Sequence, residues 1–295
     1  MSTVFKKFRT GIFSAGAFAL GLATERHFHL YADAPDQPIH SVDTVDGFLP
    51  GKPGNVGVTE SYTSRIARFG FPTLDSLRSY PNFVVSYDRR NRISNWVMEH
   101  LTRENLKSDS YDRKGIEFVE DKSVHHFFRA TNQDYKGSGY DRGHLAAAGN
   151  YRSNPEHIKE TFVLSNVAPQ VGKGFNRDKW NELEQYCRKK VHEVGQAWIC
   201  TGPLFLPQRD PSNGKLMIKY EVIGHNHVSV PTHFFKIILY ESRGTYFMES
   251  FMLPNTVIPD EKPLNMFRID PEVIERSAGI ILFNRLPRNQ IKLIK

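Results

Sequence analysis

Asp141, Arg142, Gly143 and His144 form the densest group of chemically versatile side chains in the chain. An imidazole, with an ordinary pKa of about 6.5, can take a proton from water near neutral pH. A guanidinium can hold two phosphate oxygens at once. Glycine lets the backbone approach a ligand closely or adopt a positive φ, and the aspartate can fix its neighbours by hydrogen bonding. Such a set suits hydrolysis of a phosphodiester bond, although four residues alone also fit a charged surface turn.

Three polar residues further along the chain could complete such a site, namely Asn166, Asn176 and Glu184. Eight positions separate Asn176 from Glu184, which in a helix brings the second side chain to within about 80° of the first. Both could therefore face one cleft. Alternatively, Asn176 could cap a helix and Glu184 could pair with Arg188 one turn later. The spacing alone leaves both interpretations open.

The composition indicates a globular protein with a positive surface. The 295 residues carry a formal net charge of +7, and residues 1–47 contain four basic and five acidic side chains, so the positive charge belongs to the rest of the chain. A basic surface attracts phosphate, although many basic proteins bind no anion. Cys187 and Cys200 are the only cysteines, which excludes a four-cysteine zinc site. Any metal ligands are expected to be oxygen or nitrogen atoms.

The N-terminal segment has the composition of a targeting sequence. Residues 1–24 contain no acid, and three basic residues precede a run of 13 mostly apolar residues over 11–23. That run is shorter than the roughly 20 residues of a membrane span. A mitochondrial presequence fits best, with an uncleaved membrane anchor and a secretory signal as alternatives. Residues 33–57 are rich in proline, glycine and aspartate, as linkers are. We predict a targeting segment and linker over 1–47 and one domain over 48–295.

The remaining pattern predicts an α+β fold with a mixed, largely antiparallel central sheet flanked by helices. Residues 82–87 and 93–101 are β-rich and flank a polar turn, as in a hairpin. Trp180, Leu183, Cys187 and Val191 recur at helical spacing and predict a helix over 177–194 that ends near Gly195. Further strands are predicted over 116–120, 197–201, 220–223, 228–230, 234–240 and 246–252, and a late helix over 271–277.

Several separated motifs, in this order, resemble the DNA/RNA non-specific endonuclease family, whose active site is a ββα-metal motif. The resemblance is closest to the mitochondrial endonuclease G branch and spans about 75–285. It is carried by Asn176, Trp180 and Glu184 at their spacings and by four sequences: DRGHLAAA at 141–148, NVAPQ at 166–170, TGPLFLP at 201–207 and VPTHFFK at 230–236.

The resemblance implies a role for each candidate residue. His144 resembles the general base that activates water for attack on phosphorus. Asn176 resembles the direct protein ligand of one Mg2+, with Mn2+ as a substitute, and Glu184 resembles an acid that orients metal-bound water. Arg142 would contact the phosphate. Asp141 and Asn166 would position the site, Asn166 by bonding near His144.

Some arginines remain without a clear place in this scheme. The family has a further catalytic arginine, for which Arg113 and Arg129 are candidates, but the residues around neither match the family motif. Arg89, Arg90 and Arg92 form a basic turn. That turn could be solvated surface or could contact nucleic acid.

The resemblance also implies a setting. DNA and RNA would be the substrates, and the protein would be a homodimer without a membrane span in its mature form. It would reside in mitochondria, in the intermembrane space, with relocation to the nucleus, and would serve mitochondrial nucleic-acid turnover and DNA degradation in apoptosis. Two other functions remain open: a membrane-anchored 5′ exonuclease, and a nucleic-acid-binding protein without catalytic activity.

Overall fold

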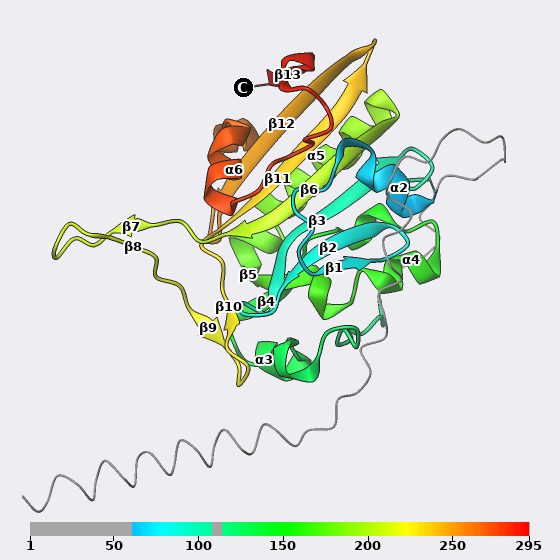
Figure 1. Ribbon diagram of the computed structural model, residues 1–295. Helices are drawn as coiled ribbons and strands as arrows, with labels where there is room; N and C mark the ends of the chain where they lie inside the picture. Colours follow the sequence, from blue (N-terminus) through cyan, green and yellow to red (C-terminus); the bar gives the residue numbers. More distant parts are fainter. Residues whose placement is uncertain (1–60, 108–113, 295) are drawn as a thin grey trace, which may run out of the picture. The chain divides into compact units, whose positions relative to one another are not determined.

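A computed structural model describes residues 61–107 and 114–294. The centre of this part is a seven-stranded sheet in the order β1-β2-β3-β6-β11-β12-β13 (Figure 1). All neighbouring strands in it are antiparallel except β12 and β13, which are parallel. The strands are β1 (Leu77–Ser79), β2 (Phe83–Asp88), β3 (Ile93–Thr102), β6 (Gln196–Leu204), β11 (His233–Ser242), β12 (Thr245–Pro254) and β13 (Ile291–Ile294).

Two hydrophobic cores lie on opposite faces of this sheet. One face packs against α5 (Lys179–Val194) and the short strands β4 (Tyr140–His144) and β5 (Val167–Val171). The other face packs against α2 (Tyr62–Ile66), α6 (Pro271–Ala278) and the segment that follows α6. We call these the site face and the back face. Alternate residues of one strand contribute to different faces, because successive side chains in a strand point to opposite sides.

The elements on the site face form a ββα unit. Strand β4 pairs with β5 in antiparallel register, with His144 opposite Val167. The chain then makes a kinked π-type turn, η5 (Gly172–Asn176), and enters α5. Helix α5 buries Trp180, Leu183, Cys187 and Val191 and ends at Gly195, whose φ of 101° favours glycine. The remaining helices are α3 (Asn132–Tyr135), α4 (Pro155–Glu160) and the single turns η1 (Ala67–Phe69), η2 (His126–Phe128), η3 (Ala148–Asn150), η4 (Leu164–Asn166), η6 (Leu264–Phe267) and η7 (Arg288–Gln290).

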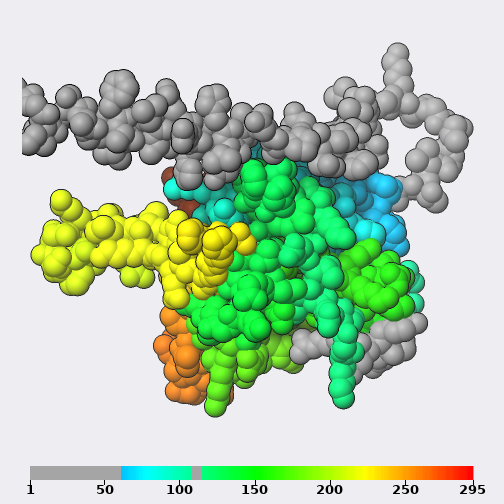
Figure 2. Space-filling model, turned by 90° about the horizontal axis from the view of Figure 1, so that it is seen from below, coloured from blue at the N-terminus to red at the C-terminus, as the bar shows by residue number. Residues whose placement is uncertain are grey.

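The segment between β6 and β11 contains two small two-stranded sheets, β7 (Gln208–Arg209) with β8 (Leu216–Met217) and β9 (Val222–Ile223) with β10 (Val228–Ser229). The β7–β8 hairpin projects from the body (Figures 1 and 2, yellow), whereas β9 and β10 pack on the body, with Ile223 and Val228 in the core of the site face. We call residues 207–222 the arm. Its exposed apolar side chains are Leu216, Met217, Ile218, Tyr220 and Val222.

The predicted fold class is confirmed, and the hairpin and both predicted helices lie within one or two residues of their predicted bounds. The strand predicted over 116–120 is wrong. Ile116 and Phe118 alternate inward as a strand would, but the segment makes only an isolated parallel bridge between Val119 and Val163. The pairing of β4 with β5 agrees with the ββα motif that the resemblance implies, but the residue pattern alone did not predict it, because the polar residues 140–144 resemble a turn. Among the described residues, no helix is long and apolar enough to cross a membrane.

Candidate active site

Strand β4 divides its side chains between two environments. Because side chains alternate along a strand, Arg142 and His144 share one side and Asp141 and Gly143 share the other. The contacts agree with this division: Phe118 contacts both Arg142 and His144, whereas Asp141 bonds to the end of η5. The Asp-Arg-Gly-His sequence therefore serves two adjoining parts of one site.

The first part surrounds the His144 ring. Phe118 lies 5.2 Å and Phe162 lies 4.7 Å from it, centroid to centroid. The Arg142 guanidinium carbon lies 4.4 Å from the Phe118 ring centroid, and Arg142 Nη1 donates to Asn132 Oδ1 at 2.7 Å. Arg142 is exposed and His144 is half-buried. A base with fixed packing and an accessible cation thus lie on one side of β4.

The second part is organised by the Asp141 carboxylate. Asn176 Nδ2 donates to Asp141 Oδ2 at 2.9 Å, and Arg177 donates to both carboxylate oxygens at 2.8 and 2.6 Å. Burial acts to raise the pKa of Asp141, but the bonds from Arg177 and Asn176 outweigh it and lower that pKa. A Cβ at Gly172 would lie 3.0 Å from both Arg177 and Asp141, so glycine leaves room for this group. Asp141 therefore stays ionised and orients the Asn176 amide.

Gly143 is required by packing and not by an unusual backbone angle. A Cβ built there would lie 2.1 Å from Oε1 of Gln170, which is fully buried across the β4–β5 pair. Such a distance is far inside van der Waals contact. Any larger residue would clash with the buried Gln170 side chain and force it to move.

The backbone after His144 is held by a buried amide. Asn166 accepts from Ala146 N–H at 2.9 Å and donates to Ala146 O at 3.0 Å and to Thr161 O at 2.9 Å. A buried lysine, Lys236, also donates to Leu145 O at 3.4 Å and to Thr201 Oγ1 at 2.6 Å. Two polar side chains from outside β4 therefore fix the residues next to the imidazole.

Helix α5 carries Glu184 beside its buried face. Glu184 is half-buried, two turns beyond Asn176, next to the core residue Cys187. The N-cap position of α5 is Asp178, so Asn176 lies before the helix and is not its cap. Arg188 Nη1 donates to Asn150 Oδ1 at 3.2 Å. Asn176 thus lies just before α5, and Glu184 lies in the second turn of this helix.

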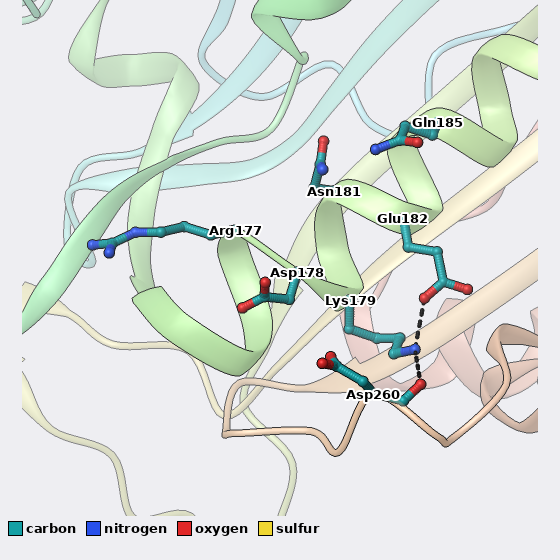
Figure 3. A pocket seen from close by; sticks show the side chains of 7 residues that line it. All are labelled: Arg177, Asp178, Lys179, Asn181, Glu182, Gln185 and Asp260. Atoms are coloured by element: carbon teal, nitrogen blue, oxygen red, sulfur yellow. Dashed lines mark hydrogen bonds and ion pairs between the residues drawn. The ribbon is translucent and has the colours of Figure 1, made fainter.

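A surface pocket lies along α5 next to this group (Figure 3). Lys179 lines it and donates to Glu182 Oε2 at 2.6 Å and Asp260 O at 3.3 Å, while Arg177 extends away from them. Its acidic side chains Asp178, Glu182 and Asp260 argue against a phosphate site. Of this pocket, only Arg177 therefore joins the candidate site.

The other predicted arginines that the structure describes lie outside this group. Arg113 is outside the described residues. Arg129 pairs with Glu120 at 3.5 Å and donates to Val124 O, which gives it a structural task. Arg89 and Arg90 are exposed in the turn between β2 and β3.

Sequence reasoning missed several residues of the site. Phe118 lies in the segment wrongly predicted as a strand. Arg177 directly follows Asn176, and this position next to a predicted metal ligand could have marked it as a site residue. Lys236 is a single charge within the apolar strand sequence HFFKIILY, and such a charge could have marked it as a buried partner. Asn132 carries no local signal, because only the tertiary fold brings it to Arg142.

This chain is similar to known proteins in sequence and in fold. The model of the DNA/RNA non-specific endonuclease family matches residues 63–289. The mitochondrial endonuclease G of Caenorhabditis elegans is 48% identical over 79% of this chain and 76% of its own length, and that of Bos taurus is 41% identical over 92% of both. A chain in the crystal structure of the EndoG/EndoGI complex is 50% identical, with a TM-score of 0.78 over 80% of this chain and 97% of that chain.

Proposed function

Because the chain belongs to the DNA/RNA non-specific endonuclease family and is a nuclease, we propose that His144 is its general base and that Asn176 holds one Mg2+. The observation that supports this most strongly is the Asp141 carboxylate. It fixes the Asn176 amide at the strand whose last residue is His144. One short strand thereby joins a proton acceptor to a cation ligand.

The proposed reaction begins with water beside His144. The imidazole takes a proton from this water as its oxygen attacks phosphorus, and the phosphorus–oxygen bond on the far side breaks. Arg142, exposed on the same side of β4, holds the phosphate oxygens. The contacts of His144 with Phe118 and Phe162 limit rotation of the ring. The chain thus supplies a positioned base and a phosphate-binding cation.

The Asn176 amide fits a hard divalent cation. Its Nδ2 donates to Asp141, so the opposite amide atom, Oδ1, is the oxygen that would bind the ion. The described residues contain no group of three or more His, Cys, Asp or Glu that could hold a metal. One amide oxygen with several waters suits Mg2+, which keeps much of its hydration, and Mn2+ is expected to substitute. When bound, the cation neutralises charge on the phosphate and activates the leaving oxygen.

Glu184 and Asn166 complete the proposed site as positioning residues. Glu184, half-buried on α5, would accept hydrogen bonds from cation-bound water. Asn166 fixes Ala146 and thereby the backbone after His144. Because the proposed contacts are to phosphate and not to bases, cleavage should show little sequence preference and should weaken at high salt.

The test is digestion of supercoiled plasmid and of RNA by the full chain, with Mg2+, with Mn2+ and with EDTA. We expect cleavage of both nucleic acids with either cation and none with EDTA. An intact circular plasmid beside degraded linear DNA would instead indicate an exonuclease. Binding without cleavage under all conditions would indicate a protein that only binds nucleic acid.

We propose a mitochondrial location, because several relatives carry that location in their names. Within this proposal, the protein lies in the intermembrane space, moves to the nucleus in apoptosis, and also serves mitochondrial nucleic-acid turnover. The predicted targeting segment, 1–47, lies outside the described residues. Imaging of a C-terminal fluorescent fusion, with and without residues 1–47, would test the mitochondrial location. A mitochondrial signal that persists without these residues would show that they are not the targeting sequence.

We also propose that the protein is a homodimer. The arm supports this, because it displays five large apolar side chains to solvent on a projecting segment. Light scattering of the purified chain would test it. A monomer mass at micromolar concentration would contradict the proposal.

A further inference from the structure

Two consecutive residues, Asn176 and Arg177, bond to the same carboxylate. Asn176 Nδ2 donates to Asp141 Oδ2 at 2.9 Å, and Arg177 Nε donates to that oxygen at 2.8 Å. Arg177 Nη2 donates to the other oxygen, Asp141 Oδ1, at 2.6 Å. The bond from Asn176 alone already orients the amide that we propose as the cation ligand. The two bonds from Arg177 therefore serve a further purpose.

The local fold directs Arg177 to this carboxylate. The Arg177 backbone N–H donates to Gly172 O at 3.1 Å, at the end of η5. A Cβ at Gly172 would lie 3.0 Å from Arg177 Nη2 and from Asp141 Oδ1, so glycine leaves room for the pair. The next residue, Asp178, accepts instead from Gly174 N–H at 2.5 Å, and Arg177 extends away from it (Figure 3). The guanidinium thus pairs with Asp141 and not with its neighbour in sequence.

Without Arg177, Asp141 would be a strong ligand for a cation held by Asn176. Its carboxylate is one hydrogen bond away from the Asn176 amide, and its side chain is 22% exposed. Carboxylate oxygens are favoured ligands of hard divalent cations. One oxygen of Asp141 can keep its bond with Asn176 while Oδ1 turns to the ion. Arg177 occupies Oδ1 instead, and a guanidinium fork matches the two oxygens of a carboxylate.

The presence or absence of a carboxylate ligand decides how a cation acts at such a site. A divalent cation bound by a neutral amide and by water keeps its full charge, with which it neutralises a phosphate. A carboxylate ligand would cancel half of that charge. It would also favour Ca2+, which takes about six to eight oxygen ligands in flexible geometry, over Mg2+, which keeps several of its waters. Mg2+ chemistry at a phosphate is therefore better served when Asp141 does not bind the ion.

We propose that Arg177 determines cation specificity by keeping the Asp141 carboxylate from binding the cation that Asn176 holds. This proposal rests on the proposed function, in which Asn176 is the cation ligand, and it gives a role to a residue that the sequence did not predict. Arg177 does not touch the cation, so it is a positioning residue that acts through Asp141. Its bidentate pair leaves the ion with an amide ligand, a modest affinity and its full charge.

The test is a titration of the full chain with Mn2+ in the absence of nucleic acid, followed by the electron paramagnetic resonance signal of free Mn2+. Arg177→Met should bind Mn2+ about tenfold more tightly than wild type, because a freed carboxylate joins the ion. Pulsed measurements in D2O should show fewer water molecules on the bound Mn2+ of the variant. Ca2+ should also displace Mn2+ from the variant more readily, relative to Mg2+, than from wild type. Unchanged or weaker Mn2+ binding, or an unchanged number of waters, would overturn the proposal.

A double-mutant cycle separates ligation by Asp141 from the simple loss of a positive charge. In the Asp141→Asn background, Arg177→Met should change Mn2+ affinity by less than about twofold, because no carboxylate is freed there. An equal gain in both backgrounds would show that Arg177 only repels the cation, and it would overturn the proposal. Arg276→Met is the matched control, because it removes an exposed arginine that pairs with Glu272 on α6, and it should bind Mn2+ like wild type. A gain in this control would attribute the effect to net charge.

The same titration tells the failure of this proposal from the failure of the proposed function. Asn176→Ala should abolish the binding of Mn2+ at the site. If Asn176→Ala binds Mn2+ like wild type, Asn176 is not the cation ligand, and the proposed function fails together with the role of Arg177. If Asn176→Ala abolishes binding but Arg177→Met leaves the affinity and the number of waters unchanged, only the role of Arg177 fails.

Discussion

The two faces of the central sheet belong to the same strands but differ in the kind of residue that they bury. Within the described chain, the three buried charged residues of the sheet strands are Glu99, Lys236 and Glu249, and all three belong to the site face. The buried strand residues of the back face include Trp96, Trp198, Phe235 and Ile237, which pack with α2 and α6. Adjacent residues on one strand, Lys236 and Ile237, thus lie in opposite kinds of environment.

The difference shows how the sheet supports the site. Burying a charge is costly unless hydrogen bonds and an opposite charge compensate. Lys236 is compensated by Leu145 O, Thr201 Oγ1 and the face of Trp180, and its charge interacts favourably with Glu99. Because Leu145 follows His144 directly, this costly group lies where the active-site backbone needs support. On the back face the described sheet strands bury no charged residue and carry no candidate residue, and their stability comes mainly from apolar packing.

The largest expected effect belongs to the imidazole. We expect His144→Ala to lower kcat by about 10²- to 10⁴-fold, because general base catalysis contributes about that much. The free energy of unfolding should change little, since the ring is only half-buried. Plasmid digestion and urea unfolding of the same preparation would measure both quantities. Turnover near the wild-type rate would remove His144 as the base.

The next effect concerns the carboxylate that holds Asn176. Asp141→Asn removes the charge that binds Arg177 and orients the Asn176 amide, so the Mg2+ concentration for half-maximal activity should rise about 10- to 100-fold. Asp270→Asn is the matched control, because Asp270 caps α6 on the back face, where its Oδ1 accepts from Glu272 N–H. A metal titration that shifts equally in both variants would contradict the assigned role.

A pair of neighbouring substitutions compares the two faces directly. Ile237→Ala should lower the free energy of unfolding by about 2–5 kcal/mol and leave kcat of the folded enzyme unchanged. Lys236→Met keeps the apolar stem but removes the donor to Leu145 O, so kcat should fall about tenfold while KM for DNA stays the same. Lys236→Met with unchanged kcat would show that the buried cation has no part in positioning His144.

Sequence patterns predicted the apolar core elements well and the polar elements of the site poorly. Apolar periodicity predicted β2, β3, β11, β12 and α5. In these segments, apolar residues recur at the spacing of a buried strand or helix. The residue pattern did not predict the pairing of β4 with β5, which only the resemblance implied, because the polar sequence of β4 is that of the site and not of a buried strand. The positions of Asn132 and Lys236 depend on contacts between residues 10 and 91 positions apart, which local patterns do not encode. Asn176 and Glu184 were found through motif spacing, and their roles stay proposals.

The smallest expected effect is a pH dependence of stability from the site face. Burial raises the pKa of Glu99, against the opposing influences of Lys236 and of hydrogen bonds from Asn150 and Tyr151. A raised carboxyl pKa adds stability below the unfolded value of about 4.3, and this stability is lost as pH rises through the folded pKa. Glu99→Gln cannot ionise and lacks this loss. The unfolding free energy of wild type relative to Glu99→Gln should therefore fall as pH rises above about 4.3.

Urea unfolding of wild type and Glu99→Gln across this range would measure that difference. Glu104→Gln is the control for loss of a carboxylate outside the buried site face, because the Glu104 side chain is 82% exposed. If the relative stability of wild type instead rose with pH, attraction to Lys236 would outweigh the burial of Glu99. The buried charges of the site face would then stabilise the folded protein. Both faces would be stabilising, the site face through charge attraction and the back face through apolar packing.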